Sequence, residues 1–226
     1  MASQRANGDA QKSNGGATQA ERLLDTAATL FRQKGYAGTT TRDLAAELGL
    51  RNASLYHYTR SKANLLYEIC ITSLANLQSA VSEAVQKEAD PLARVVAMIR
   101  RHMQVILADS DAHTTMLIEM RALPEDQLRE VIFRRGKYES IIRNVLAEAQ
   151  QAGVLRGDVS PSYLTLALFS LMNWSLFWYD TAGELSVEDL AEILIRLFLE
   201  GAQDESRREE TAMSGTATPL TGQAKG

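Results

Sequence analysis

Cysteine, proline and long apolar runs are scarce in this chain of 226 residues, and each scarcity excludes a class of protein. The single Cys70 cannot support a disulfide framework, and it favours a reducing, cytoplasmic setting. Only four prolines and 14 glycines are present, so long segments lack helix breakers, which favours helices over strands. The longest apolar run, residues 163–179, is shorter than the ~20 residues that a membrane-spanning helix needs. We therefore expect an all-α, cytoplasmic protein that does not enter a membrane.

Charge is unevenly distributed along a chain whose formal net charge is -4. Residues 1–62 contain nine Lys or Arg against five Asp or Glu, a net charge of +4. Residues 63–226 contain 15 basic against 23 acidic residues, a net charge of -8. A basic front joined to an acidic body is expected when only one part of a protein meets a polyanion such as nucleic acid.

Apolar periodicity divides the chain into ordered segments between two tails. Residues 1–17 and 204–226 have no periodicity, no basic-then-apolar signal opens the chain, and we expect both ends to be disordered. Between the tails we expect two helical domains, at residues 18–62 and 63–203.

Capping signals mark the first helices. Thr18 with Glu21, and Thr40 with Asp43, have the spacing of capping boxes, in which each side chain satisfies a free backbone N–H at a helix start. Gly35 is placed to end the first helix in a left-handed conformation.

Residues 41–55 have the pattern of a helix-turn-helix. The small Ala45 permits close approach of a second helix, Gly49 supplies a tight turn, and Leu55 returns to the same apolar face. We expect Asn52 to cap the short helix that follows the turn. Because this pattern lies in the basic segment, it favours binding to DNA.

After residue 62 the periodicity predicts six amphipathic helices with no strand and no internal repeat. We expect Asp111 to cap the third of them, Pro124 to open the fourth, and Ser186 with Asp189 to cap the last. The expected helices are 64–88, 91–108, 111–121, 124–153, 161–179 and 186–201.

Five segments of the front domain resemble the TetR family of bacterial transcriptional regulators. They are FRQKGYAGTTTRDLA at 31–45, GL at 49–50, SLYHY at 54–58, SK at 61–62 and LL at 65–66. Two positions differ: Arg51 stands where the family usually has Ser or Thr, and Thr59 where it usually has Phe. The resemblance implies an all-helical homodimer with a three-helix DNA-binding head. It also implies a helical body that binds a small effector and dimerises through its last two helices.

In a helix-turn-helix the start of the second helix faces base edges in the major groove, and the first helix lies along the phosphate backbone. Arg pairs with guanine and Asn with adenine, while Ser, Thr and Tyr hydroxyls commonly contact phosphates. We expect Leu55 and Tyr58 to point inward. The residues expected to contact DNA are Thr39, Thr41, Arg42, Arg51, Asn52, Ala53, Ser54, Tyr56, His57 and Lys62.

Segments of the body resemble a TetR subgroup that regulates fatty-acid and steroid degradation and typically senses a coenzyme A thioester. They are EMRALP at 119–124, RRGKYE at 134–139, NWSLFWY at 173–179 and GELS at 183–186. We expect most of the rings in the 161–179 helix to pack in the core or at a dimer interface. We also expect some of them to line an apolar cavity that binds the effector. The residues expected to bind the effector are Met103, Met116, Met120, Arg121, Arg134, Tyr138, Phe169, Asn173, Trp174, Phe177 and Trp178.

The sequence contains no Gly-rich phosphate loop, no nucleophilic-serine motif and no His/Cys cluster at metal-ligand spacing. We therefore expect no enzyme, no metal and no cofactor other than the effector. His102 and His113 fall on different predicted helices and give only weak support for catalysis. The alternatives are a TetR-type regulator of efflux or another pathway that senses a non-CoA hydrophobic molecule, a ligand-independent DNA-binding protein, and a partner-binding adaptor.

Overall fold

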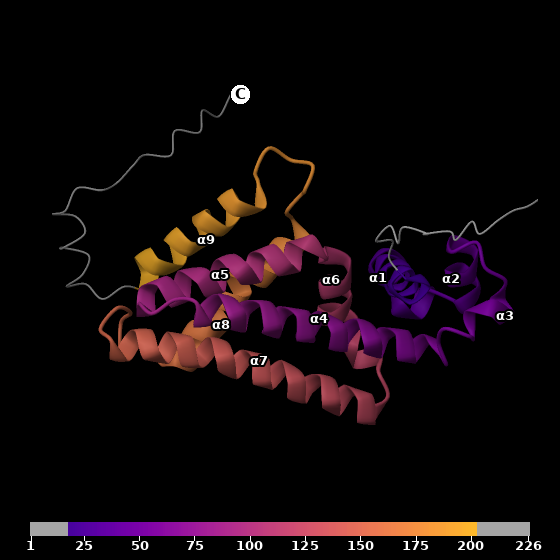
Figure 1. The fold of residues 1–226 in the computed structure, drawn as a ribbon, viewed down its shortest axis with the longest axis horizontal. Coiled ribbons are helices and arrows are strands. Elements are labelled where there is room, and N and C mark those ends of the chain that lie inside the picture. The colour runs from indigo at the N-terminus through magenta and orange to yellow at the C-terminus, as the bar shows by residue number, and fades with distance from the viewer. Residues whose placement is uncertain (1–17, 203–226) are drawn as a thin grey trace, which may run out of the picture.

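The computed structural model describes residues 18–202, and every regular element in that range is helical (Figure 1). The predicted all-α fold is confirmed, while the predicted tails lie outside the described residues. The elements are α1 Gln19–Gly38, α2 Thr41–Glu47, α3 Asn52–Leu55, α4 Lys62–Gln86, α5 Pro91–Ala108, α6 Ser110–Glu119, the 3-10 helix η1 Met120–Ala122, α7 Glu125–Gln151, α8 Pro161–Trp174, the 3-10 helix η2 Ser175–Phe177 and α9 Val187–Ala202.

The helices form a small head and a larger body (Figure 1). Helices α1, α2 and α3 make the head, and α4 to α9 make the body, with α4 running from one to the other. The first turns of α4 contribute Leu65 and Leu66 to the head core, and its later turns contribute Leu77 and Val81 to the body core. A single rigid helix therefore belongs to both parts. The domain boundary near residue 62 stays a prediction.

The predicted capping boxes at the front are present. The Thr18 hydroxyl accepts from Glu21 N at 3.2 Å, the Thr40 hydroxyl accepts from Asp43 N at 3.2 Å, and both carboxylates return a bond to the cap backbone. Gly35 has φ 75° as expected, but it produces a kink rather than an end. After that kink α1 continues to Gly38.

Two predicted features of the body are wrong. Asp109, not Asp111, caps α6, since its carboxylate accepts from Ala112 N at 3.4 Å. The regular part of the apolar 161–179 helix ends at Trp174 and is followed by η2. At α9 the expected cap is present, because the Ser186 hydroxyl accepts from Asp189 N at 3.0 Å.

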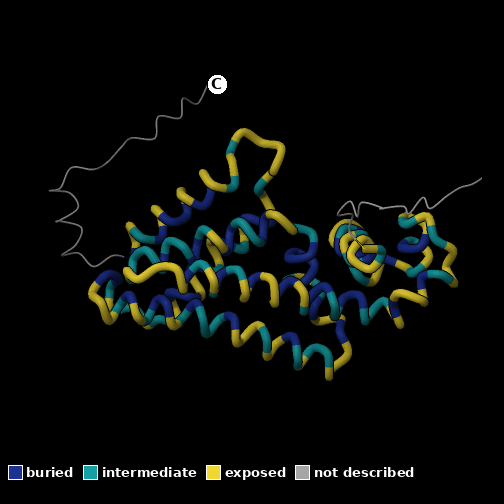
Figure 2. The backbone as a smooth tube through the Cα atoms, in the orientation of Figure 1, coloured by how far each residue is buried: buried dark blue, intermediate teal, exposed yellow. Residues whose placement is uncertain are grey.

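Residues coloured dark blue in Figure 2 are buried, and they occur in both the head and the body. Met98, Ile99 and Ile142 are among the fully buried residues of the body core. Within residues 18–202, no helix is both long and apolar enough to cross a membrane.

Candidate functional site

The turn between α2 and α3 presents a set of exposed polar side chains on the head. Arg51, Asn52 and Ala53 are exposed, Ser54 is half-buried, and Leu55 beneath them is fully buried. The prediction that Asn52 caps α3 is wrong: Arg51 occupies the cap position, and its side chain makes no capping hydrogen bond. Asn52 is the first helical residue instead, so its side chain is free to face a ligand outside the head.

The aromatic row that follows α3 lies entirely on the surface. Tyr56 is 54% exposed, Tyr58 is 48% exposed, and His57 is exposed as well. The prediction that Tyr58 packs inside is wrong, because the position one helical turn after Leu55 is Thr59, whose N–H donates to the Leu55 carbonyl at 3.2 Å. Thr59 is 5% exposed, and its hydroxyl donates to the Ser61 carbonyl at 3.0 Å. A polar residue thus occupies this inner position with its hydrogen bond satisfied.

Two residues predicted to contact DNA have internal partners instead. Thr39 is fully buried, and its hydroxyl lies 3.2 Å from the Leu30 carbonyl and 2.9 Å from the Gly35 carbonyl. The Lys62 ammonium donates to the carbonyls of Tyr36 at 2.6 Å and Thr39 at 2.8 Å. That ammonium also lies 4.2 Å from the centre of the Tyr36 ring, a cation–π contact. Both side chains therefore hold the end of α1 and are not directed at a phosphate, which corrects those two predictions.

Thr41 and Arg42 begin α2, where Thr41 is half-buried and Arg42 is exposed. Arg42 and the exposed residues of the α3 turn form one outward set of the head, and this set keeps most of the predicted DNA contacts together. The set is Arg42, Arg51, Asn52, Ala53, Tyr56 and His57, and we call it the head surface.

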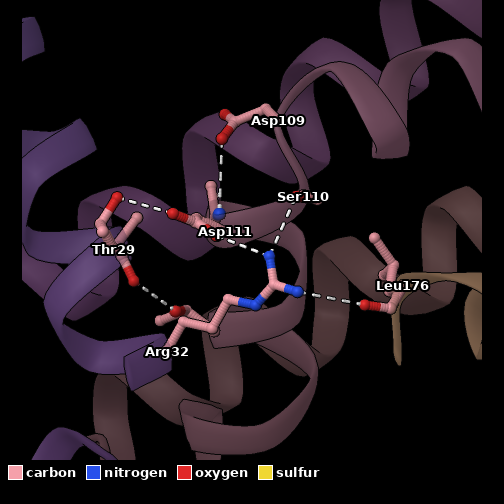
Figure 3. Close-up of polar contacts among 9 residues, drawn as sticks. Thr29, Arg32, Asp109, Ser110, Asp111 and Leu176 are labelled. Atoms are coloured by element: carbon pink, nitrogen blue, oxygen red, sulfur yellow. Dashed lines mark hydrogen bonds and ion pairs between the residues drawn. The ribbon is translucent and has the colours of Figure 1, made fainter. Parts of the chain in front are cut away.

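The head is fastened to the body by a polar cluster between α1 and α6 (Figure 3). Asp111 of α6 accepts from the Arg32 guanidinium at 2.6 Å and from the Thr29 hydroxyl at 2.6 Å. The same guanidinium lies 3.0 Å from the Ser110 hydroxyl and 3.4 Å from the Leu176 carbonyl. We call these five residues the α1–α6 latch. Asp111, predicted as a helix cap, is instead a tertiary contact.

A polar cluster lies buried in the body between α5, α7 and α8. His102 Nδ1 is 2.7 Å from the Tyr138 hydroxyl oxygen, and its Nε2 is 3.4 Å from Asn173 Oδ1. Both ring nitrogens are satisfied when Tyr138 donates to Nδ1 and Nε2–H donates to Asn173. Burial lowers the pKa of His102 to about 3, with a smaller contribution from nearby His113, and burial raises the pKa of Tyr138. Both side chains are therefore uncharged.

His113 of α6 faces the same region. Its side chain is buried, its residue is 2% exposed, and burial lowers its pKa to about 4. Neither ring nitrogen has a hydrogen-bond partner among residues 18–202. His102 and His113 line one cavity whose other walls come from α4, α6, α7 and α8, with Arg135 and Glu139 among its polar lining residues. The cavity is partly open to solvent, and its volume is about 40 Å³, enough for no more than a few water molecules.

A second hollow runs along the outside of α4 and α7. This groove has a volume of about 540 Å³, and Leu74 lines both it and the cavity. Arg134, Lys137 and Phe133 line the groove, and the Lys137 ammonium lies 4.4 Å from the centre of the Phe133 ring. Arg134 donates to Glu130 at 2.6 Å, so its charge is partly neutralised within α7.

Comparison with known proteins identifies the protein family of both the head and the body. Residues 23–69 match the family described as bacterial regulatory proteins, tetR family, and residues 88–202 match the Tetracyclin repressor-like C-terminal domain. The chain belongs to the TetR family. It is therefore a DNA-binding transcriptional regulator, and the prediction that it is not an enzyme is confirmed by this membership.

Relatives cover most of the chain. KstR2, an HTH-type transcriptional repressor of Rhodococcus jostii, is 27% identical over 180 residues, 79% of this chain and 88% of KstR2. The crystal structure of PfmR, a TetR family regulator from Thermus thermophilus, is 31% identical with a TM-score of 0.73 and covers 79% of this chain and 97% of PfmR. The crystal structure of AibR in complex with isovaleryl coenzyme A and operator DNA is 25% identical with a TM-score of 0.72, covering 80% of this chain and 97% of AibR.

The structure brings together only part of the effector site predicted for this TetR-family body. Met116, Tyr138, Phe169 and Asn173 line the cavity. The other predicted residues lie elsewhere: Met103 is fully buried in the body core, Met120 is buried in the core shared with the head, Arg121 is exposed on η1, Arg134 lines the outer groove, and Trp174, Phe177 and Trp178 are 65%, 48% and 53% exposed.

The two histidines that line the cavity were not among the residues predicted from the sequence to bind the effector. A usable signal was present, because His102 follows Met98 and Ile99 at helical spacing and must therefore share their buried face. His113 carried no comparable signal, since α6 buries five consecutive residues, 112–116, and shows no single apolar face.

Many of the exposed large apolar side chains of this TetR-family chain lie on α8, η2 and α9. Tyr163 is 70% exposed, Leu166 54%, Trp174 65% and Leu197 56%. Large apolar side chains on neighbouring turns form a surface of the kind that proteins usually cover. We call this set the α8–α9 face.

Proposed function

We propose that this TetR-family regulator is a repressor that binds a palindromic operator as a dimer and is released by a hydrophobic effector, a coenzyme A thioester. The observation that carries the proposal is the double role of α6. One helix of ten residues, Ser110–Glu119, supplies His113 and Met116 to the cavity and Asp111 to the α1–α6 latch. The cavity and the head are thus joined by one short rigid element.

The small volume of the cavity gives the effector a way to act. An acyl chain does not fit in about 40 Å³, so its entry must move the walls apart. A shift of α6 carries Asp111 with it, and the head then changes position through Arg32. A ligand that binds the expanded body more tightly than the closed one shifts the population toward it. By linkage, operator DNA weakens effector binding by the same factor.

The head surface supports binding in the major groove. Arg51 and Asn52 stand at the start of α3, where side chains reach base edges, and Arg42 and Tyr56 lie to the sides for phosphate contacts. Two heads of a dimer would then lie about one helical turn of DNA apart, ~34–36 Å, and read two half-sites.

The α8–α9 face supports dimerisation through the last two helices. Trp174, Leu166 and Leu197 would expose their apolar surface to water in a single chain. Covering them with the same face of a second copy removes that cost with a two-fold symmetric contact. Leu197→Glu together with Leu166→Glu should convert a dimer to monomers in sedimentation velocity runs, and a dimer that persists in this variant excludes the face as the interface.

The relatives support the coenzyme A thioester. AibR was crystallised with isovaleryl coenzyme A and operator DNA, and its sequence is similar to this chain over most of the length. In this chain the outer groove, at about 540 Å³, offers room for a nucleotide-sized group beside Arg134 and Lys137. Leu74 lines both the groove and the cavity, so we infer that one ligand can place an acyl chain in the cavity and a charged portion in the groove. A regulator of this kind acts on chromosomal DNA in the cytoplasm.

The DNA-binding part is tested after an operator has been selected from a pool of random duplexes. Arg51→Ala with Tyr56→Ala should lower operator affinity at least 100-fold with unchanged helicity by circular dichroism, because both side chains are exposed on the head surface. The matched control, Arg129→Ala, removes an exposed cation of α7 that is not part of the head surface and should leave affinity within twofold. Unaltered binding of the double variant would refute the assignment of this surface.

The effector part is tested by titrating thioesters into the complex with DNA. Dodecanoyl-CoA should release the operator at micromolar concentration, whereas free coenzyme A should not, because it lacks the apolar chain. Release by an apolar compound without a coenzyme A group, and by no thioester, would contradict the proposed ligand class and favour the alternative regulator of another pathway.

A further inference from the structure

His113 is the unusual member of the cavity wall. The ring is buried, and neither nitrogen makes a hydrogen bond of ordinary length and angle within residues 18–202, although the Asp109 backbone one turn earlier is near enough to oppose part of the fall in its pKa. A neutral imidazole carries one donor and one acceptor. His102, which lines the same cavity, is paired through Tyr138 and Asn173. The buried His102 ring therefore has hydrogen-bond partners for its nitrogens, and the buried His113 ring does not.

A buried imidazole that makes no hydrogen bonds destabilises the folded protein. Buried polar groups in folded proteins almost always have a hydrogen-bond partner, and one left unpaired destabilises the fold. A leucine or methionine at this position would fill the wall without that cost. Retention of an unpaired polar group at a cavity wall is therefore expected where a ligand supplies the partner.

The surroundings of His113 define the partner chemically. Its pKa is lowered to about 4 and that of His102 to about 3, in each case mainly by burial, so both rings are neutral near pH 7. A neutral ring donates to a carbonyl oxygen, or donates to and accepts from a hydroxyl. Arg135 and Glu139 also line the cavity, so a ligand carboxylate would meet a negative charge as well as a positive one, and the two neutral rings would give it no compensating charge.

We propose that His113 is a specificity-determining residue that binds an uncharged carbonyl or hydroxyl oxygen of the effector inside the cavity. The inference rests on the proposed function, because it assumes that a hydrophobic ligand enters this cavity, and it adds which polar group that ligand must carry. The His102–Tyr138–Asn173 cluster has its own hydrogen bonds and lines the same cavity, with Phe169 packed against the His102 and Tyr138 rings. The effector is thus an apolar molecule with an internal oxygen function, bound through α6.

Three probes with chains of similar length distinguish the contribution of the carbonyl oxygen to binding affinity from that of the apolar chain. Counted in the chain attached to the coenzyme A sulfur, 3-oxododecanoyl-CoA has two carbonyl groups, dodecanoyl-CoA has one, and the thioether S-dodecyl-CoA has none. Calorimetric titration into the wild-type full chain should show tighter binding of the carbonyl-bearing probes than of the thioether. In His113→Leu those two probes should lose about tenfold in affinity, equal to ~1.4 kcal/mol, while the thioether should keep or improve its affinity.

Two variants serve as controls. His113→Asn retains a neutral donor and acceptor and should preserve the order of the three probes. Arg129→Ala changes an exposed residue of α7 that lines neither the cavity nor the groove, and it should alter none of the three affinities. If His113→Leu weakens all three probes by the same factor, the ring has a packing role and the inference is overturned. If no probe binds the wild-type protein, the proposed thioester effector fails first and the inference falls with it.

Two further measurements do not depend on the affinity of the leucine variant. The chain contains three histidines, so the ¹⁵N imidazole spectrum is simple to assign. The ring nitrogens of His113 should shift when dodecanoyl-CoA binds and shift much less with the thioether; equal shifts would contradict a bond to the carbonyl. Without ligand, His113→Leu should melt at the same or a higher temperature, because it removes an unpaired buried group. A lower melting temperature would indicate a structural role instead.

Discussion

Loss of the Arg32–Asp111 pair should uncouple the head from the body. The perturbation is a double-mutant cycle of Arg32→Ala and Asp111→Ala, which isolates the pair from other effects of each substitution. The pair joins α1 to α6 at 2.6 Å across the boundary between head and body (Figure 3). Because Asp111 also accepts from Thr29 at 2.6 Å, its removal leaves two donors of α1 without their acceptor.

The structure sets the expected magnitude. A hydrogen bond to a charged group contributes ~1.5–3 kcal/mol when it is shielded from water. The Arg32 and Asp111 side chains are 35% and 32% exposed, so solvent screening reduces the coupling energy to ~1–2 kcal/mol. For a chain of this size, each ~1 kcal/mol corresponds to a shift of roughly 2–4 °C in Tm. The pair Arg129–Glu125, whose side chains are 66% and 86% exposed, should couple by only ~0.3–0.5 kcal/mol.

The assay has two readouts for the same variants. Urea unfolding gives the coupling energy in the free protein, and fluorescence anisotropy of labelled operator gives the factor by which dodecanoyl-CoA weakens DNA binding. That factor should fall at least fivefold in Asp111→Ala and stay unchanged in the Arg129→Ala control. A coupling energy no larger than that of the exposed control pair, or full retention of the effector response, would refute the role of the α1–α6 latch.

Three other predictions follow from buried groups and backbone geometry. Burial holds the folded-state pKa of His102 and His113 below the unfolded value near 6.5. The free energy of unfolding should therefore be highest above pH 6.5 and fall below it by up to ~1.4 kcal/mol per pH unit for each ring. A melting temperature that stays constant from pH 7.5 to 5 would contradict this. Burial raises the pKa of Cys70 to about 12, so a disulfide reagent at pH 8 should leave the native thiol unmodified and react fully only in urea. Gly35→Ala should lower the free energy of unfolding by ~1–2 kcal/mol, since φ is 75° there; an unchanged urea midpoint would count against the strain.

The helix starts that could be predicted from sequence are those with local causes. A capping box needs two side chains three residues apart, so Thr18 with Glu21 and Ser186 with Asp189 can be found without a structure. The cap of α6 cannot be chosen in this way, because Asp109 and Asp111 lie two residues apart and both carry a carboxylate that can cap a helix. The choice between them depends on Arg32, which is 79 residues away in sequence and close only in the folded protein.

The aromatic residues show a second limit. Hydrophobicity indicates that a ring will leave water, but it does not distinguish the core of one chain from a surface covered by another molecule. The sequence therefore suggests Trp174 at the cavity, whereas it stands exposed on the α8–α9 face. Counting its turn as helix predicts Tyr58 in the head core, but the chain leaves the helix after Leu55 and Thr59 takes the inner position. The pairing of His102 with Tyr138 required the tertiary structure.

The most direct test of the account is one anisotropy titration, in which dodecanoyl-CoA is added to the wild-type protein bound to its selected palindromic operator. The account predicts release of the DNA at micromolar thioester, no release by free coenzyme A, and operator DNA weakening thioester binding by the same factor. Operator that stays bound at saturating concentrations of every probe, with a thioester bound in the cavity at the same time, would contradict it.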